Sequence, residues 1–105
     1  MRVFVCRAQD VPLGTTRRFE PEGLPALALA RCESGLYAVI DNCSHEDYPL
    51  SEGVVVPDLC EIECARHGST FSLLDGEPQC LPATRPVEVF ELETDGEDVY
   101  VVVPQ

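Results

Sequence analysis

The chain has 105 residues, of which 19 are acidic and seven are basic, so its formal net charge is −12. A surface this acidic repels nucleic acid and anionic membranes, and it attracts basic patches on other proteins, although acidity also serves plain solubility. The length suits one hydrophobic core, and no apolar run approaches the ~18 residues of a membrane span. We therefore expect a single domain over residues 1–105 that binds neither nucleic acid nor membrane.

The N-terminal part of the chain predicts short strands. An apolar, β-rich run predicts a strand at 2–7, and β-branched residues predict a second at 14–19. Further apolar runs at 26–32 and 36–40 flank a glycine-containing connection of hairpin length. Alanine content would also allow a helix at 24–31, but Pro25 and the nearby hairpin partner favour a strand.

Two pairs of potential metal ligands follow this hairpin. They are Cys43 with His45 and Cys64 with His67, and these are the two histidines of the chain. Two thiolates and two imidazoles suit a tetrahedral structural zinc site. They also suit a [2Fe–2S] cluster with both thiolates on one iron and both imidazoles on the other. The donor count alone does not choose between these centres.

The segment before the second ligand pair has the alternating pattern of a strand with one buried face. Cys60, Ile62 and Cys64 occupy every second position and alternate with Leu59, Glu61 and Glu63. Since successive strand residues point to opposite faces, we expect Cys64 to point inward together with Cys60 and Ile62.

The C-terminal part predicts further strands. Residues 70–74 suit a strand, whereas prolines exclude a regular ladder over 81–86. Residues 87–93 and 98–103 flank a strong hairpin turn at Thr94-Asp95-Gly96-Glu97. Because 99–103 is apolar at every position, we expect both faces of that strand to be covered, as in stacked sheets.

The other four cysteines are interpreted as thiols. The N-terminus lacks the apolar core and small-residue cleavage site of an export signal, so we expect a cytoplasmic protein. A reducing compartment favours free thiols over disulfides. We therefore expect small buried hydrophobic residues at Cys6, Cys32, Cys60 and Cys80.

The residues around the ligand pairs resemble the Rieske pattern of Cys-x-His, an intervening segment, and Cys-x-x-His-Gly. The likeness continues through Leu50-Ser51-Glu52-Gly53, Asp75-Gly76, 82–86 and the final hairpin. Most of the chain is similar to the small Rieske ferredoxins that serve bacterial ring-hydroxylating oxygenases in the catabolism of aromatic compounds.

This resemblance implies an all-β Rieske-type fold of stacked antiparallel sheets. A basal β-sandwich (about 1–41 and 81–105) would carry a cluster-binding insertion (about 42–80). Cys43 and Cys64 would bind a buried iron, and His45 and His67 an outer iron near solvent, where electrons enter and leave. The segment with Pro82 would cover the cluster, and Gly68 would let backbone N–H groups approach its sulfurs.

Departures from the pattern bear on the reduction potential. High-potential respiratory Rieske proteins have Cys-x-His-x-x-Cys and Cys-x-Cys-His, whose extra cysteines form a disulfide, but Tyr48 and Arg66 stand at those positions here. Those proteins also have a serine and a tyrosine that donate hydrogen bonds to the cluster. In this chain Ser69 is at the serine position, whereas Phe71 is at the tyrosine position. We expect a low to intermediate potential.

Charged neighbours of the ligands suggest a docking surface at Glu46, Asp47 and Arg66. Glu46 and Arg66 would pair across the two loops, or Arg66 would meet a carboxylate of another protein. As the simplest alternative, both are solvated charges.

The resemblance implies a monomeric one-electron carrier rather than an enzyme, with transient electrostatic docking. It would pass electrons from a flavin-dependent NAD(P)H reductase to a terminal Rieske non-haem iron oxygenase. Three alternatives stay open: the small Rieske-like subunit of an assimilatory nitrite reductase, a zinc-bound Cys2His2 interaction module, and a redox sensor or donor to another oxidase.

Overall fold

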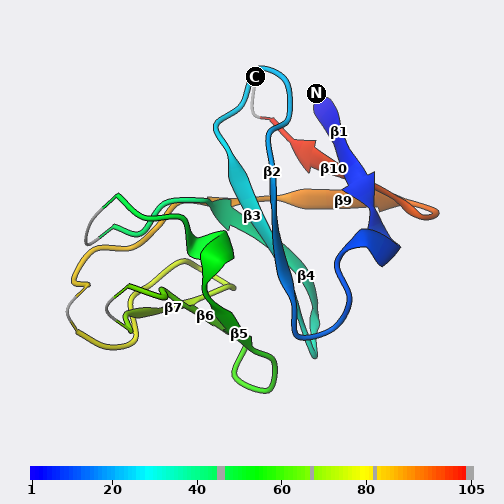
Figure 1. Ribbon diagram of the computed structural model, residues 1–105. Coiled ribbons are helices and arrows are strands. Elements are labelled where there is room, and N and C mark those ends of the chain that lie inside the picture. The colour runs from blue at the N-terminus through cyan, green and yellow to red at the C-terminus, as the bar shows by residue number, and fades with distance from the viewer. Residues whose placement is uncertain (45–46, 67, 82, 104–105) are drawn as a thin grey trace.

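The computed structural model describes residues 1–44, 47–66, 68–81 and 83–103. Over these residues the chain forms antiparallel sheets and two single-turn 3₁₀ helices (Figure 1). No helix in the described ranges has the length and apolar character needed to cross a bilayer. The elements, in order, are β1 (Arg2–Arg7), η1 (Ala8–Asp10), β2 (Thr16–Phe19), β3 (Leu27–Cys32), β4 (Gly35–Ile40), η2 (Leu50–Glu52), β5 (Val54–Val56), β6 (Glu61–Glu63), β7 (Thr70–Ser72), β8 (Val89–Phe90), β9 (Leu92–Asp95) and β10 (Asp98–Val102).

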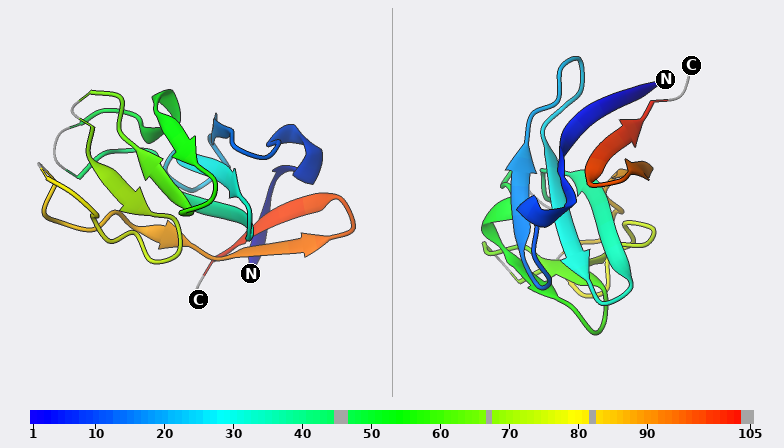
Figure 2. Two further views of the ribbon diagram at one scale, coloured as in Figure 1. Left: turned by 90° about the horizontal axis from the view of Figure 1, so that it is seen from below. Right: turned by 90° about the vertical axis from the view of Figure 1, so that its right-hand side faces the viewer.

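The described strands form three sheets with the orders β1-β10-β9, β2-β3-β4-β8 and β5-β6-β7. The first two combine strands from both ends of the chain, and the N–H of Val103 donates to the carbonyl of Met1 at 2.7 Å. The third sheet is built from consecutive strands and lies to one side of the other two (Figures 1 and 2). The expected all-β architecture of antiparallel sheets is confirmed.

Several strands agree closely with the sequence expectations. The first strand has the predicted bounds, and β3 pairs with β4 from Leu27↔Ile40 to Cys32↔Gly35, so the helical alternative at 24–31 is excluded. Cys60, Ile62 and Cys64 are only 7%, 0% and 1% exposed, which confirms their shared inward face.

The C-terminal hairpin differs from the expectation in two respects. Residues 87–93 do not form one strand: β8 pairs with β4, whereas β9 pairs with β10, because the chain passes from one sheet to another at Glu91. The expected double-sided cover of 99–103 is also wrong. Val99 and Val101 are buried while Tyr100 and Val102 are half-buried, because side chains rather than a sheet cover the outer face.

An aromatic pair provides that outer cover. The rings of Phe4 and Tyr100 meet edge to face with centroids 5.8 Å apart, and the guanidinium carbon of Arg2 lies 4.1 Å from the Tyr100 centroid. Aromatic and cation–π contacts of this kind stabilise a solvent-facing sheet surface without a second layer. A run of apolar residues therefore does not require burial on both faces.

The expectation of four buried thiols is wrong for three of the four cysteines. Cys32 and Cys60 are buried, but they form a disulfide, and Cys80 is exposed. The fold brings the Cα atoms of Cys32 and Cys60 to 5.1 Å, a separation typical of disulfides, although the two residues are 28 positions apart in sequence. Cys6 is buried as expected.

Two glycines are required where the chain packs against itself near the third sheet. A Cβ atom at Gly53, just before β5, would overlap the carbonyl oxygen of Glu63. A Cβ atom at Gly76, whose φ is +80°, would overlap the carbonyl oxygen of Val87. Both glycines thus let two segments of backbone come into contact.

Candidate metal centre

The two cysteines of the predicted ligand pairs are buried in the same hydrophobic cluster. Cys43 is 2% exposed and Cys64 is 1% exposed, and neither takes part in the disulfide. Cys43 follows β4, and Cys64 follows β6 directly. The structure thereby places in one cluster two thiols that are 21 positions apart in sequence and that follow strands of different sheets.

One backbone hydrogen bond of the same type closes each of the two loops that begin at these cysteines. The N–H of Cys43 donates to the carbonyl of Tyr48 at 2.9 Å, and the N–H of Cys64 donates to the carbonyl of Ser69 at 2.7 Å. Each bond therefore spans five positions of the chain. His45 and His67 fall within these spans and lie outside the described residues.

Gly68 tightens the second loop. Its N–H donates to the carbonyl of Cys64 at 3.0 Å, and its φ of +76° lies in the left-handed region that glycine adopts without strain. Its predicted role, close backbone approach to the cluster with N–H donation to the sulfurs, stays a prediction.

A buried carboxylate anchors the first loop. Asp41 accepts from the N–H and the Oγ of Ser51 at 2.7 and 2.6 Å and from Nη1 of Arg18 at 3.1 Å, and its side chain is fully buried. It therefore links β2, the end of β4 and η2 around Cys43. Sequence reasoning missed Asp41; the available signal was an acidic residue two positions before a predicted ligand, at the end of an apolar strand.

The segment around 80–86 contacts both loops. The hydroxyl of Ser44 donates to the carbonyl of Arg85 at 2.6 Å, and the N–H of Ala83 donates to Oγ of Ser69 at 3.2 Å. On the same segment, Sγ of Cys80 donates to the carbonyl of Gly68 at 3.4 Å. Pro82, the residue expected to cover the centre, lies outside the described residues, but its neighbour Ala83 is seated against the second loop.

Ser69 and Phe71 are fully buried beside Cys64. The Oγ of Ser69 accepts the Ala83 N–H, which leaves the hydroxyl hydrogen of Ser69 able to donate in another direction. Phe71 is on β7 opposite Ile62 and has no hydroxyl. The second loop therefore has one side-chain donor at these two positions instead of two.

Tyr48 and Arg66 connect the two loops through a ring contact. The guanidinium carbon of Arg66 lies 5.8 Å from the centroid of the Tyr48 ring. The alternative pairing of Arg66 with Glu46 falls outside the described residues. Asp47 is exposed, and its Oδ1 accepts from Nδ2 of Asn42 at 3.2 Å.

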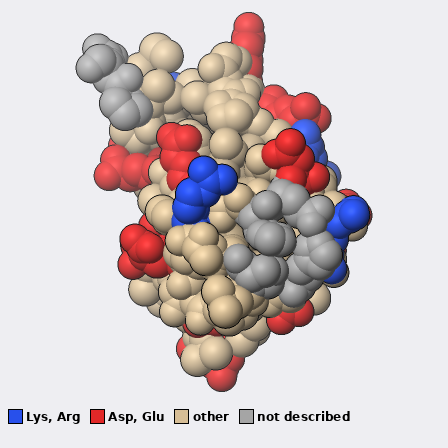
Figure 3. All heavy atoms as spheres, turned by 90° about the vertical axis from the view of Figure 1, so that its left-hand side faces the viewer, with Lys and Arg blue, Asp and Glu red and all other residues tan. Residues whose placement is uncertain are grey.

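Acidic side chains dominate the surface at this end of the molecule. Figure 3 shows the face that carries the loops, and on its described residues red acidic groups outnumber blue basic groups, of which one lies near the middle of the view and others at the right.

The donor set and its surroundings fit an iron–sulfur cluster. Two buried thiols stand at the ends of equivalent backbone loops, next to apolar side chains and a serine hydroxyl. Thiolates of this kind bind iron–sulfur clusters, and hydrogen bonds and solvent exclusion around them adjust the potential. The sequence places one histidine in each loop, so the two loops together contain two cysteines and two histidines.

Comparisons with known proteins agree on one family. The family description "Rieske [2Fe-2S] domain" matches residues 1–91. The 3-phenylpropionate/cinnamic acid dioxygenase ferredoxin subunit of Shigella boydii serotype 4 (strain Sb227) is 34% identical over 104 residues, covering 99% of this chain and 95% of that protein.

Solved structures give the same result. The ferredoxin of carbazole 1,9a-dioxygenase from Nocardioides aromaticivorans IC177 superposes with a TM-score of 0.89 at 29% identity, covering 96% of each chain. A complex of reduced oxygenase and oxidized ferredoxin in carbazole 1,9a-dioxygenase contains a chain with 40% identity and a TM-score of 0.85, covering 95% of this chain and 91% of that one.

Proposed function

The chain belongs to the Rieske [2Fe–2S] family, among the ferredoxin subunits of aromatic dioxygenases, and on this premise we propose that it carries electrons from a flavin-dependent NAD(P)H reductase to a terminal Rieske non-haem iron oxygenase. It is an electron-transfer component and not a catalytic oxygenase. The observation that supports the proposed role most strongly is the pair of buried cysteines on equivalently closed loops, each loop holding one histidine in sequence.

The cofactor is a Rieske [2Fe–2S] cluster, which accepts and releases one electron at a time. We assign Cys43 and Cys64 to one iron and His45 and His67 to the other. The burial of both cysteines supports this assignment because thiolates on the inner iron need shelter from water. The histidines would then form the route for electrons to and from other proteins.

The residues around these ligands have separate tasks in the proposal. Asp41 holds the first loop against η2 through Ser51, and Ala83 holds the second through Ser69. Ser69 would offer its hydroxyl hydrogen to the cluster and favour the reduced state, whereas Phe71 offers none. A single side-chain donor supports a low to intermediate potential.

We propose that residues 42–80 form a cluster-binding insertion within a basal part formed by about 1–41 and 81–105. The sheet β5-β6-β7 lies entirely within that insertion, while the basal sheets combine strands from both ends of the chain, which supports this division. The segment with Pro82 would close the site at the boundary.

Docking would be electrostatic and transient, with the chain acting as a monomer. The net charge of −12 and the acidic surroundings of the loops support partners with basic surfaces. Glu46, Asp47 and Arg66 are the residues we assign to this contact. A donor that uses NAD(P)H implies that the transfer takes place in the cytoplasm.

Reconstitution tests the proposed role. The holoprotein is mixed with NADH, a dioxygenase flavoprotein reductase and a terminal aromatic-ring oxygenase, and dihydroxylated product is measured. We expect product only when all components are present, with a rate that falls as salt rises from 50 to about 300 mM because charged encounter is screened. Reduction by the reductase without transfer to any oxygenase, but with transfer to a nitrite reductase, would contradict the proposal in favour of the alternative partner.

A further inference from the structure

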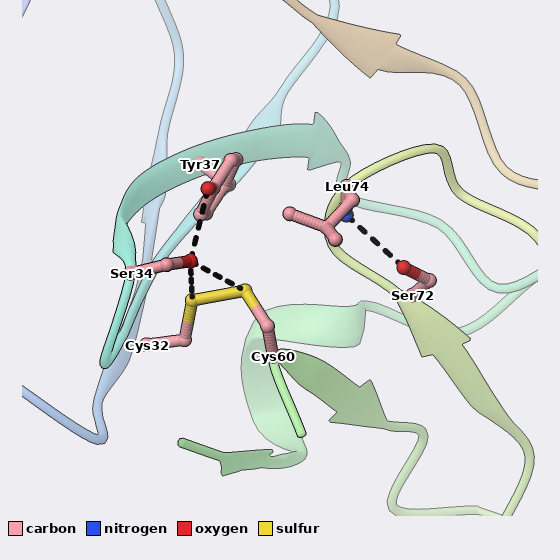
Figure 4. Close-up of a disulfide and its surroundings, with 6 residues drawn as sticks. All are labelled: Cys32, Ser34, Tyr37, Cys60, Ser72 and Leu74. Carbon is pink, nitrogen blue, oxygen red and sulfur yellow. Dashed lines mark hydrogen bonds between the residues drawn. A yellow bond between two sulfur atoms is a disulfide. The ribbon is translucent and has the colours of Figure 1, made fainter. Parts of the chain in front are cut away.

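The Cys32–Cys60 disulfide lies outside both ligand loops and connects two parts of the molecule. Cys32 is the last residue of β3 in the four-stranded sheet, and Cys60 ends the turn between β5 and β6 in the three-stranded sheet (Figure 4). A backbone bond from the N–H of Glu33 to the carbonyl of Pro57, at 3.1 Å, joins the same two regions.

Cys60 is directly connected to the strand that delivers Cys64. Residues 61–63 form β6, and Cys64 follows it. The carbonyl of Cys60 accepts from the N–H of Leu73 at 2.8 Å, and Cys60 has a φ of +52°, in the left-handed region that residues other than glycine adopt at a cost. The disulfide therefore constrains the strand that carries one of the two ligand cysteines.

The Ser34 hydroxyl lies beside the two sulfurs and in turn contacts the hydroxyl of Tyr37. The Oγ of Ser34 lies 3.3 Å from Sγ of Cys32 and 3.7 Å from Sγ of Cys60, and it is 3.0 Å from the hydroxyl oxygen of Tyr37 (Figure 4). Ser34 is exposed to solvent. A hydrogen bond from this hydroxyl to a sulfur becomes stronger when that sulfur becomes a thiolate, because hydrogen bonds to charged acceptors are stronger than those to neutral ones.

The two sulfurs differ in access and in their distance from Ser34. Cys60 is 7% exposed and Cys32 is 2% exposed, so both are buried and Cys60 is the more exposed residue of the two. Attack at Cys60 releases Cys32 as the leaving thiolate, which is the sulfur nearer to the Ser34 hydroxyl.

We propose that Cys32–Cys60 is a reversible disulfide, opened by a dithiol reductant with assistance from Ser34, and that its closed state holds β6 in the position that presents Cys64. The second part rests on the proposed function, since it requires Cys64 to be a cluster ligand; the first part does not.

The exchange balances without any further reactant. One thiolate of the dithiol forms a bond to Sγ of Cys60, the Cys32–Cys60 bond breaks, and Cys32 leaves with the electron pair and takes up a proton. The second thiolate of the reductant then attacks its own partner sulfur and releases Cys60, which is protonated in turn. The dithiol is thereby oxidised to a disulfide, and a low-molecular-weight disulfide reverses the sequence.

Thiol mapping on the holoprotein tests the first part. The protein is incubated in dithiothreitol for increasing times, alkylated, digested and analysed by mass spectrometry at the Cys32 and Cys60 peptides. We expect both to become alkylated together. Ser34→Ala should slow the opening about tenfold, which is the effect of losing about 1.4 kcal/mol of stabilisation from a hydrogen bond to a developing thiolate.

Ser72→Ala is the matched control because the Ser72 hydroxyl accepts the N–H of Leu74 and lies apart from the disulfide (Figure 4). Its opening rate should equal that of the unaltered protein. Failure of both cysteines to open while the protein stays folded, or equal rates for the Ser34 and Ser72 variants, would overturn the proposal.

Cluster lifetime tests the second part. The half-life of the visible absorption in the presence of an iron chelator is compared between oxidised protein, dithiothreitol-opened protein and the Cys32→Ala/Cys60→Ala double variant. We expect a several-fold shorter half-life in the last two. Equal half-lives with normal opening would overturn only the role in presenting Cys64. A protein that binds no cluster would overturn the proposed function, while the thiol result would stand.

Discussion

Arg66 of the second ligand loop lies over the ring of Tyr48 in the first, with 5.8 Å between its guanidinium carbon and the ring centroid. These are the two positions at which respiratory Rieske proteins, by the sequence resemblance, have disulfide-forming cysteines. A noncovalent contact thus connects the loops at this point. Cation–π contacts at exposed sites are worth about 0.5–1 kcal/mol, so this connection is weaker than a covalent one.

Removing the Arg66–Tyr48 contact should loosen the loops measurably but slightly. In a double-mutant cycle of Arg66→Ala and Tyr48→Ala, we expect a coupling of about 0.5–1 kcal/mol in the free energy of unfolding, measured in urea. The control cycle pairs Arg66→Ala with Tyr100→Ala, since Tyr100 lies on β10, outside both loops, and makes its ring contact with Phe4. Equal coupling in both cycles would contradict a specific contact.

Local patterns predicted most of the fold because they reflect local physics. Alternation at 59–64 identified the inward face of Cys64, and the glycine-containing connection identified the β3–β4 hairpin. The switch of 87–93 between sheets was not predictable, because a continuous β-rich run does not reveal which neighbour each half pairs with.

The sequence predicted only part of the candidate site and its surroundings. The ligand spacing indicated Cys43 and Cys64, which lie in one buried cluster, whereas His45 and His67 lie outside the described residues and stay predicted ligands. Asp41 and the Cys32–Cys60 disulfide were missed because both depend on contacts between distant parts of the chain: Asp41 meets Arg18 and Ser51, and the two cysteines are 28 residues apart. Their partners are fixed by tertiary packing, which local patterns do not specify.

Asp41 should stabilise the fold through its buried hydrogen bonds. Asp41→Asn keeps the size but replaces one accepting oxygen with a donor and removes the charge that meets Arg18, so we expect a loss of about 1–3 kcal/mol in the free energy of unfolding. Denaturant titration followed by circular dichroism measures it. Asp58→Asn, at an exposed carboxylate, is the control, and equal stability of the two variants would be contrary to this anchoring role.

Ser69 should raise the reduction potential. We expect Ser69→Ala to lower the midpoint by about 60 mV or more, the equivalent of losing a hydrogen bond worth about 1.5 kcal/mol to a charged acceptor. Spectroelectrochemical titration measures the midpoint. Ser44→Ala serves as a comparison, since the Ser44 hydroxyl already donates to the carbonyl of Arg85. An unchanged midpoint in the Ser69 variant would show that its hydroxyl does not act on the cluster.

Cys6 should make the protein less stable in alkali. Burial, followed by the charge of Asp10, raises the pKa of the Cys6 thiol to about 11, while Arg17 and Arg31 act in the opposite direction. The folded protein keeps this proton to higher pH than the unfolded chain does. The resulting stability is therefore complete below about pH 9 and is lost as pH rises toward 11.

The difference between the unaltered protein and Cys6→Ala isolates this effect, because the remaining titrating groups are the same in both. We expect the free energy of unfolding of the unaltered protein to fall more steeply between pH 9 and pH 11. Parallel curves for the two proteins would rule out a buried, neutral Cys6 thiol as the cause.

Pulsed EPR on the dithionite-reduced protein, produced with nitrogen-15 in its histidines, examines the ligand set most directly. If His45 and His67 bind one iron while Cys43 and Cys64 bind the other, the spectrum of the reduced cluster should contain couplings to two histidine nitrogens. A reduced cluster with one such coupling or none would contradict the assignment.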